Sequence, residues 1–318
     1  MHKGLSLQKI FDLKIFREIS DEIPKNCVAT VGVFDGVHLG HQYIIRQLKR
    51  LADSCDVEEL VITMNPHPAV FFGREIDLLS TMEEKFDLLE KLGVRNLLVL
   101  NFNSEIAGMS GTQFIDDILV SRLSVIRLLL GYNNSIGHKE NGVSEIYSGK
   151  IPVSRLDRFH IDYSDDISSS SIRMLLSTSE IELANKYLGY EYSISGSVVH
   201  GYGIGRKIGF PTANIELPSK AKIVPANGAY VVAAQIEGEM FPAMLNIGLR
   251  PTFDGQKRTI EMHVLDYDRD IYGKEVKVIF RHCLRDEQKF AGTEELVMQL
   301  ENDKLKVIEY FKEHPLAL

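Results

Sequence analysis

The sequence predicts an α/β N-terminal domain with a Rossmann-like parallel sheet, followed by a C-terminal antiparallel β-barrel with a C-terminal helix. Three observations lead to this fold class. The chain has 318 residues, a length that suits two domains. Strand-like and helix-like segments alternate in the first half. In the second half, strand-like segments follow one another with Gly and Pro between them. We place the boundary so that the domains span residues 1–187 and 188–318.

Short apolar runs alternate with helical periodicity in the first half of the chain. The expected strands are residues 28–33, 60–64, 97–100 and 125–130. The expected helices are residues 42–52, 81–92 and 112–122. The second helix has capping-box spacing, because Glu84 follows Thr81 by three residues. Alternation at this spacing indicates a parallel sheet covered by helices.

Strand signals dominate the second half. The expected strands are residues 193–199, 229–237, 241–247, 259–265 and 275–280. Gly238 stands between two of them and predicts a tight turn. Residues 294–312 have the apolar spacing of a closing helix or a pair of helices. Together these segments predict a compact antiparallel barrel.

Composition excludes several classes of function. The formal net charge of −8 disfavours broad nucleic-acid binding, which needs a basic surface. The three cysteines are scattered and lack metal-ligand spacing, so we interpret them as reduced thiols of a cytoplasmic protein. No apolar run has the length of a signal peptide or of a membrane span.

Residues 32–41 are the strongest early motif. They follow a buried strand and open a helix, and they include His38 and His41. A helix N-terminus presents free amide groups that suit phosphate. Imidazoles there can donate hydrogen bonds to the charge that develops on a transferring phosphate. Two alternatives are open: the histidines cap or pack, or they bind zinc, although a third zinc ligand at the usual spacing is missing.

Two further segments strengthen a phosphate-transfer interpretation. Residues 63–68 place His67 between two prolines, and residues 167–173 join a serine run to Arg173. With residues 32–41, they resemble the HxGH nucleotidyltransferases, and more closely the bacterial bifunctional riboflavin kinase/FAD synthetases. The resemblance implies that His38, His41 and His67 contact ATP phosphates. It also implies that Ser170 and Arg173 hold the leaving pyrophosphate, while the FMN phosphate attacks the α-phosphate directly.

The N-terminal half departs from the family pattern at three places. In residues 131–137 both glycines and Asn133, a flavin-binding candidate, remain, but Asn134 and Ile136 replace two aromatic residues. Aromatic side chains there could stack on a ring, so we expect weaker ring binding. Ser171 stands where a Lys or Arg is common, and the stretch before the serine run is slightly short. These departures leave open a weakened or idle transferase domain.

A glycine-rich segment opens the chemistry of the second half. Residues 201–209 contain four glycines together with Arg206 and Lys207. The register fits neither a Walker A loop nor a Rossmann fingerprint, and we expect no helix after it. We expect a mobile cationic loop whose backbone amides close on polyphosphate. The candidate phosphate-binding residues are Gly201, Gly203, Gly205, Arg206 and Lys207.

Thr212 and Asn214 are the most specific pair in this half. Side chains two residues apart on a strand point to the same side. A hydroxyl and an amide oxygen suit magnesium, which takes few protein ligands and completes its shell with nucleotide phosphates. The alternative is an ordinary turn at the entry to a strand.

Four later segments follow in order: residues 246–253, 261–266, 271–273 and 284–290. With the glycine-rich segment, they resemble the riboflavin kinase domain over residues 196–303. The resemblance implies that Thr212 and Asn214 hold magnesium and ATP phosphates, and that Glu261 takes the proton of the riboflavin 5′-hydroxyl. We expect His263 to be structural, and Arg285 is alternatively a surface ion pair. The flavin-binding candidates in this half are Asn246, Gly248, Arg250, Thr252, Arg285 and Phe290.

The sequence therefore predicts ATP-dependent phosphorylation of riboflavin to FMN in the C-terminal domain and adenylylation of FMN to FAD in the N-terminal domain. One alternative is a riboflavin kinase with an inactive transferase domain, and a second is a non-catalytic flavin-binding regulator. The expected partners are riboflavin, FMN and ATP with Mg²⁺, without a prosthetic group, nucleic acid or membrane. We expect a monomer or a weak homo-oligomer.

Overall fold

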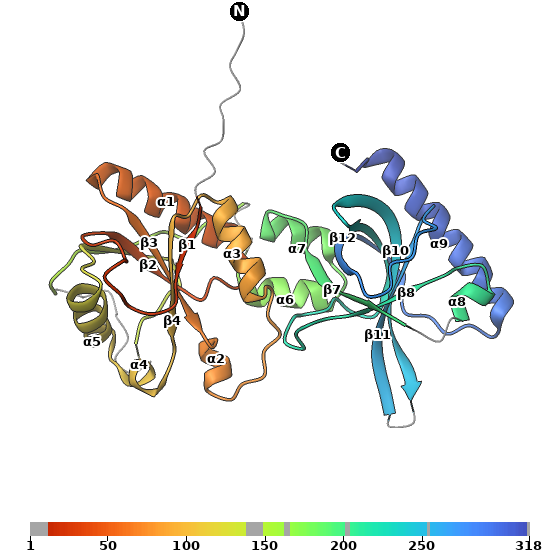
Figure 1. Ribbon diagram of the computed structural model, residues 1–318, viewed down its shortest axis with the longest axis horizontal. Helices are drawn as coiled ribbons and strands as arrows, with labels where there is room; N and C mark the ends of the chain where they lie inside the picture. Colours follow the sequence, from red (N-terminus) through yellow and green to blue (C-terminus); the bar gives the residue numbers. More distant parts are fainter. Residues whose placement is uncertain (1–11, 138–148, 162–165, 201–203, 253–254, 317–318) are drawn as a thin grey trace, which may run out of the picture. The chain divides into compact units, whose positions relative to one another are not determined.

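The computed structural model describes residues 12–137, 149–161, 166–200, 204–252 and 255–316 (Figure 1). By its internal contacts the chain divides into a first unit, Met1–Ser169, and a second unit, Ser170–Leu318. This division lies before the two helices that precede the barrel, whereas the predicted boundary follows them. The boundary at 187/188 stays a prediction.

The first unit contains a six-stranded sheet in which every pair is parallel. This confirms the predicted fold class. The order is β1 (Lys14–Phe16), β4 (Asn96–Asn101), β3 (Glu59–Asn65), β2 (Val28–Val31), β5 (Arg127–Leu130) and β6 (Val153–Arg155). The two edge strands were not predicted, because each has only three residues, mostly exposed, and therefore carries no apolar run.

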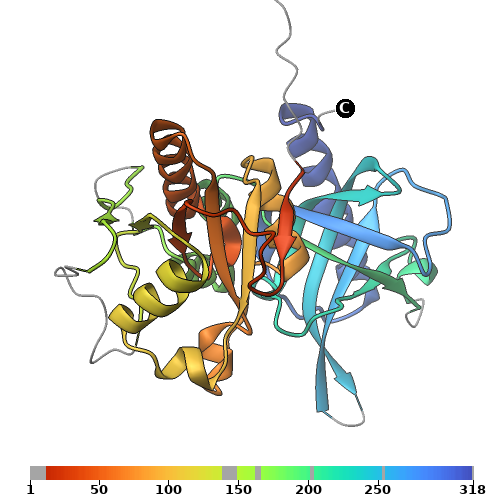
Figure 2. The same cartoon turned by 60° about the vertical axis from the view of Figure 1, so that its left-hand side comes forward.

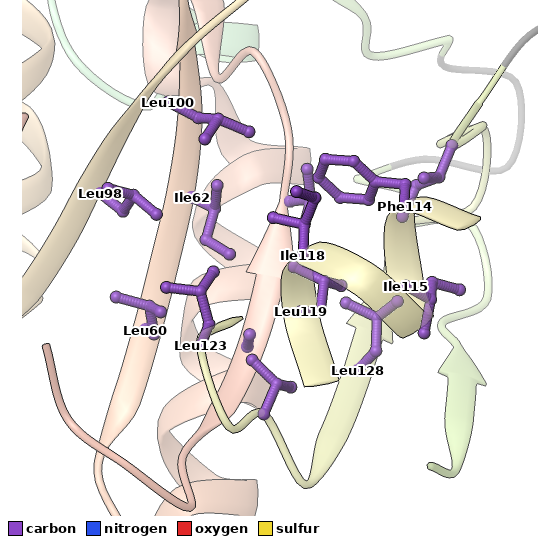
Figure 3. Packing of buried hydrophobic residues seen from close by; sticks show 14 of the residues in the cluster. Leu60, Ile62, Leu98, Leu100, Phe114, Ile115, Ile118, Leu119, Leu123 and Leu128 are labelled. Carbon is purple, nitrogen blue, oxygen red and sulfur yellow. The ribbon is translucent and has the colours of Figure 1, made fainter. Parts of the chain in front are cut away.

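The central strands are apolar on both faces, as parallel strands covered by helices are. Leu60 and Ile62 of β3 point into one hydrophobic cluster, while Val61 between them points into another. Figure 3 shows the first cluster, where leucines and isoleucines of the sheet pack against apolar side chains of residues 114–123. Ile45, Leu48 and Ala52 on the other side come from the predicted helix after the histidine motif.

The helices of this unit include α1 (Leu39–Cys55), α2 (Pro68–Phe71), α3 (Met82–Lys91), α4 (Ser104–Gly108) and α5 (Gly111–Gln113), with a short 3₁₀ segment, η1 (Asp35–Val37). The predicted capping box of Thr81 and Glu84 is present at α3. Residues 112–122 are helical, as expected, but the helix type changes along them: α5 passes into a π-helix, η2 (Phe114–Arg122). Phe114, Ile115, Ile118 and Leu119 of this π-helix are buried in the core.

The second unit contains a closed antiparallel barrel, as predicted. Its order is β10 (Glu239–Thr252), β11 (Gly255–Val264), β8 (Ala213–Glu216), β7 (Ser193–Val199), β12 (Glu275–Asp286) and β9 (Gly228–Ile236). The expected turn at Gly238 is a two-residue hairpin, with φ of 50° at Glu237 and 88° at Gly238. Strands β10 and β11 continue past the barrel as a two-stranded ribbon (Figure 2).

Four helices belong to this part of the chain: α6 (Ser169–Ser177), α7 (Ile181–Leu188), α8 (Ile204–Lys207) and α9 (Thr293–Glu313). The closing segment is thus one helix, which packs Val297, Leu300 and Val307 against the barrel. A short helix, α8, forms one turn within the glycine-rich segment, and strand β8 rather than a helix follows this segment, as expected. The amide of Phe210 donates to the Gly205 carbonyl, 2.8 Å away, which closes this turn. Within the described residues, no helix has the length and apolar character needed to cross a membrane.

Candidate functional sites

The predicted histidine motif forms a strained turn between β2 and α1. Phe34 and Val37 have φ of 52° and 38°, which non-glycine residues adopt at a cost of about 1–3 kcal/mol each. The surrounding structure offsets this cost. Buried Asp35 accepts hydrogen bonds from the amides of Leu79 and Ser80, at 3.0 and 3.1 Å. The turn is therefore fixed by the segment that precedes α3.

His38 and His41 lie together at the start of α1. Their rings stack with centroids 3.7 Å apart, and the edge of Phe34 contacts His41 at 5.2 Å. Burial, followed by the charges of His38 and Lys85, holds the pKa of His41 well below its ordinary value. A neutral His41 keeps one N–H donor for a ligand. Both rings stand where the helix N-terminus favours an anion.

His67 lies at the N-cap of α2. Its Nδ1 accepts a hydrogen bond from the amide of Ala69, 3.0 Å away. Because Nδ1 is the acceptor, the neutral ring carries its proton on Nε2. The Nε2–H group is thus the hydrogen-bond donor of the His67 ring, and its phosphate-binding role stays a prediction.

An apolar cavity of about 570 Å³ opens beside the turn between β2 and α1, at the carboxyl ends of β2 and β3. Its wall includes residues that the sequence analysis missed, because they come from separate elements: Met64, Phe72, Arg74, Phe102, Ala107 and Phe114. Asn134 and Ile136 also line it, and the Asn134 side chain donates to the Val31 carbonyl. Asn133 is exposed and does not line the cavity. Aromatic side chains thus reach the cavity from other positions than the family pattern suggests.

Ser170 and Arg173 lie on α6 in the second unit, Ser170 exposed and Arg173 half-buried. Ser169, the last residue of the first unit, donates from Oγ to the carbonyl of Asp35, 3.0 Å away. This bond ties Ser169 to the histidine turn within the first unit. The roles of Ser170 and Arg173 stay predictions.

Three neighbouring barrel strands align polar side chains in a row. Glu261 on β11 is the register partner of Asn214 on β8 and of Asn246 on β10. Thr212 Oγ1 lies 3.5 Å from a carboxylate oxygen of Glu261, and Thr259 Oγ1 lies 3.4 Å from the other. The side chains predicted to bind magnesium, to act as base and to contact the flavin therefore share one part of the barrel wall.

The donors at this place are hydroxyl, amide and carboxylate oxygens, which fit a magnesium ion that keeps water and phosphate ligands. Among the described residues, no three His, Cys, Asp or Glu side chains come together to hold a metal by themselves. Zinc bound by such a cluster is thus not supported at His38 and His41, and the oxygen donors of the barrel do not resemble a zinc site.

His263 faces the segment before β8. Its Nδ1 lies 2.7 Å from the carbonyl of Pro211, and the ring of Phe210 contacts it edge-on. Burial lowers its pKa, so the ring is held neutral in the barrel wall. This environment agrees with the expected structural role.

A second cavity, of about 480 Å³, adjoins Thr212 and Ala213. His200 and Tyr272 line it and stack with centroids 3.9 Å apart. Of the predicted loop residues, Gly205, Arg206 and Lys207 lie in α8, while Gly201 and Gly203 fall outside the described residues. A Cβ at Gly205 would stand 2.2 Å from the Phe210 carbonyl, so glycine is required for this close approach.

Arg285 forms an ion pair, but not the surface pair considered from sequence. Its Nε and Nη2 lie 3.0 and 2.8 Å from one carboxylate oxygen of Asp303 on α9. The side chains are only 12% and 2% exposed. The guanidinium also lies over the ring of Phe290, at 5.7 Å from its centroid. The pair fixes Arg285 beside Phe290, and the contact of both residues with the flavin stays a prediction.

The remaining flavin candidates lie on the ribbon strand β10. Arg250 and Thr252 pair with Lys257 and Gly255 on β11. At Gly248 a Cβ would stand 2.7 Å from Glu287 Oε1, which accepts a hydrogen bond from the amide of Leu249. Glu287 is a residue that the sequence analysis did not single out. Its contact with β10 appears only in the folded barrel.

Comparison with known proteins gives a separate family model for each half of the chain. The FAD synthetase family model matches residues 20–170, and the riboflavin kinase model matches residues 188–311. The bifunctional riboflavin kinase/FMN adenylyltransferase of Bacillus subtilis is 37% identical over 92% of this chain and 95% of its own length. The chain belongs to the bifunctional riboflavin kinase/FMN adenylyltransferase family.

Other members of the bifunctional family are similar over the same extent. The Listeria monocytogenes enzyme is 37% identical, over 90% of this chain and 93% of its own length. The Escherichia coli enzyme is 33% identical, over 94% of this chain and 98% of its own length. A crystal structure of a macrolide-efflux protein from Streptococcus pneumoniae superposes with a TM-score of 0.82 at 29% identity, covering 92% of this chain and 97% of that one. The matches extend over both units.

Proposed function

We propose that this chain phosphorylates riboflavin with ATP in its second unit and adenylylates the FMN product in its first unit. The observation that carries the kinase assignment is the row of Asn246, Glu261 and Asn214 with Thr212 beside it. The transferase assignment rests on stacked His38 and His41 next to an apolar cavity of ring-binding size. Family membership supports both activities together rather than the kinase alone or a non-catalytic regulator.

In the kinase unit, Glu261 accepts the proton of the riboflavin 5′-hydroxyl, which is worth about 10²–10⁴ in rate. The hydroxyl oxygen then bonds to the γ-phosphorus, and the bond from this phosphorus to the β-phosphate oxygen breaks to release ADP. Thr212 and Asn214 would hold magnesium, which neutralises phosphate charge when bound. Gly205, Arg206 and Lys207 cover the phosphates, with Gly201 and Gly203. The flavin contacts are Asn246, Gly248, Arg250, Thr252, Arg285 and Phe290.

In the transferase unit, an oxygen of the FMN phosphate attacks the α-phosphorus of ATP, and pyrophosphate leaves. His38, His41 and His67 donate hydrogen bonds to the phosphates, so that the developing charge is stabilised. Ser170 and Arg173 bind the leaving pyrophosphate. The cavity lined by Phe72, Phe102 and Phe114 accommodates the flavin ring. Asn133 is a flavin contact by the family resemblance alone.

One incubation tests the assignment. The purified chain receives riboflavin, ATP and magnesium chloride, and chromatography resolves the flavins. FAD supports two activities, FMN alone supports a kinase with an idle transferase domain, and unchanged riboflavin supports a non-catalytic protein. Repeating the incubation with EDTA tests the magnesium requirement, because FMN formation then stops.

We also propose a cytoplasmic protein with small-molecule partners only, without nucleic acid or membrane, and present as a monomer or weak homo-oligomer. The net charge of −8 supports the absence of nucleic-acid binding. Light scattering after gel filtration, over a range of protein concentrations, tests the oligomeric state.

A further inference from the structure

A buried lysine lies beneath the histidine turn, in a position that the sequence analysis did not single out. Lys85 on α3 is 5% exposed. Its ammonium donates a hydrogen bond to the carbonyl of Val33, 2.8 Å away. Thr63 Oγ1 donates to the same carbonyl at 3.0 Å. Two donors therefore converge on the residue where β2 passes into the strained turn.

The lysine is one of several contacts that dock the start of α3 under this turn. Asp35 accepts from the amides of Leu79 and Ser80, and Ser80 Oγ accepts from the amide of Gly36 at 3.0 Å. These contacts hold the middle of the turn. Lys85 holds its beginning, one residue before Phe34 adopts its left-handed conformation.

Burying an ammonium group is costly even when it is hydrogen-bonded, and an apolar side chain of similar volume would avoid that cost. Burial lowers the pKa of Lys85 to about 8, while the Asp35 carboxylate acts in the opposite direction. The group is therefore mostly charged at neutral pH. Its charge acts on His41 and contributes to keeping that ring neutral. A cation retained at such a place needs a reason beyond packing.

We propose that Lys85 is a positioning residue for adenylyl transfer. Its ammonium fixes the Val33 carbonyl, so that the turn presents His38 and His41 to a polyphosphate chain, and it places a positive charge behind them. The charge favours binding of triphosphate and pyrophosphate in a site shielded from water. This inference rests on the proposed transferase function of the first unit.

Lys49 provides a matched control. It lies on α1 of the same unit, and its Nζ donates to the carbonyls of Leu92 and Gly93, at 3.1 and 2.8 Å. Lys49→Met therefore removes a lysine that bonds backbone carbonyls, as Lys85→Met does, but at the far end of α3. A defect shared by both variants would be structural.

The test compares wild type, Lys85→Met, Lys85→Gln and Lys49→Met in the full chain. We expect Lys85→Met to lower kcat/KM for ATP in FAD formation by about tenfold or more, less than the loss of a direct transition-state donor. We expect KM for FMN and the riboflavin kinase rate to stay unchanged. Equal FAD formation by the Lys85→Met and Lys49→Met variants would overturn the proposal. If Lys85→Met unfolds the first unit, Lys85→Gln is judged by the same criteria.

Calorimetric titration with inorganic pyrophosphate separates this proposal from the proposed function. If wild type forms no FAD, the transferase assignment fails, and pyrophosphate binding alone decides the role of Lys85. Binding at least tenfold weaker in Lys85→Met than in Lys49→Met supports the proposal. Equal binding in the two variants contradicts it.

Discussion

Asn214 and Glu261 are register partners on the adjacent antiparallel strands β8 and β11, although 47 positions separate them in the chain. Thr212, which directly precedes β8, approaches the same carboxylate at 3.5 Å. Strand pairing therefore brings the proposed magnesium donors and the proposed base to one place. The barrel wall holds them there, because backbone hydrogen bonds on both sides fix the register of β11.

Replacing Glu261 by glutamine should remove FMN formation and leave the fold intact. The amide keeps the size of the side chain but cannot accept the hydroxyl proton, so we expect kcat to fall by about 10²–10⁴. Glu216→Gln is the control, because Glu216 is exposed at the end of β8. Steady-state FMN formation measures the effect. Turnover of Glu261→Gln equal to that of the control would remove Glu261 from its role.

Replacing His41 by asparagine should impair FAD formation and spare the kinase. Loss of one preorganised donor to a developing charge costs about 10²–10³ in rate. The control is His160→Asn, an exposed histidine of the same unit. Assays start from FMN for the first activity and from riboflavin for the second. A parallel fall in both activities would contradict the division into two sites.

Filling the apolar cavity should raise KM for FMN. Ala107 lies in its wall on α4, and the Ala107→Phe substitution places a ring in the space of about 570 Å³. We expect FMN binding to weaken by about tenfold or more, because the ring competes for buried apolar contacts worth about 1.4 kcal/mol or more. Ala107→Ser keeps the cavity open and serves as the control. Fluorescence titration with FMN reports the affinity, and unchanged affinity would place the flavin elsewhere.

Stability of the first unit should decrease on acidification. Burial lowers the pKa of His41 well below its ordinary 6.5, so the unfolded chain binds a proton that the folded chain does not. The free energy of unfolding therefore decreases as the pH falls below about 6.5, the pKa of histidine in the unfolded chain. The decrease is at most about 1.4 kcal/mol per pH unit. Urea unfolding at pH 7.5 and pH 5 measures this loss. His41→Asn should reduce the pH dependence, and His160→Asn should not.

Much of the fold follows from local patterns. The central strands of the first unit are continuous apolar runs because helices cover both faces, so they could be recognised without the structure. The edge strands β1 and β6 could not, since each is short and mostly exposed. The change to a π-helix after α5 also escaped prediction, because the buried residues Phe114, Ile115, Ile118 and Leu119 would share one face of an α-helix as well.

In the candidate sites, too, some features could be predicted from the sequence and others could not. His38 and His41 stand within one turn of a helix, so their proximity is already contained in their spacing. The cavity beside them could not be predicted from spacing, because Phe72, Phe102 and Phe114 come from elements that only the folded sheet brings together. Lys85 was missed for a related reason: its spacing on α3 is ordinary, and only its burial against Val33 distinguishes it.

By itself, the sequence determined the two fold classes, the family resemblance and the short motifs whose residues are neighbours along the chain. Tertiary structure decided which distant side chains meet. It brings Glu261 to Thr212 and Asn214, and Arg285 to Asp303. It also places the aromatic side chains that line the first cavity beside the histidine turn. The physical reason is that periodicity and turn chemistry act over a few residues. Strand register and core packing join positions tens of residues apart, and they are set only when the whole domain folds.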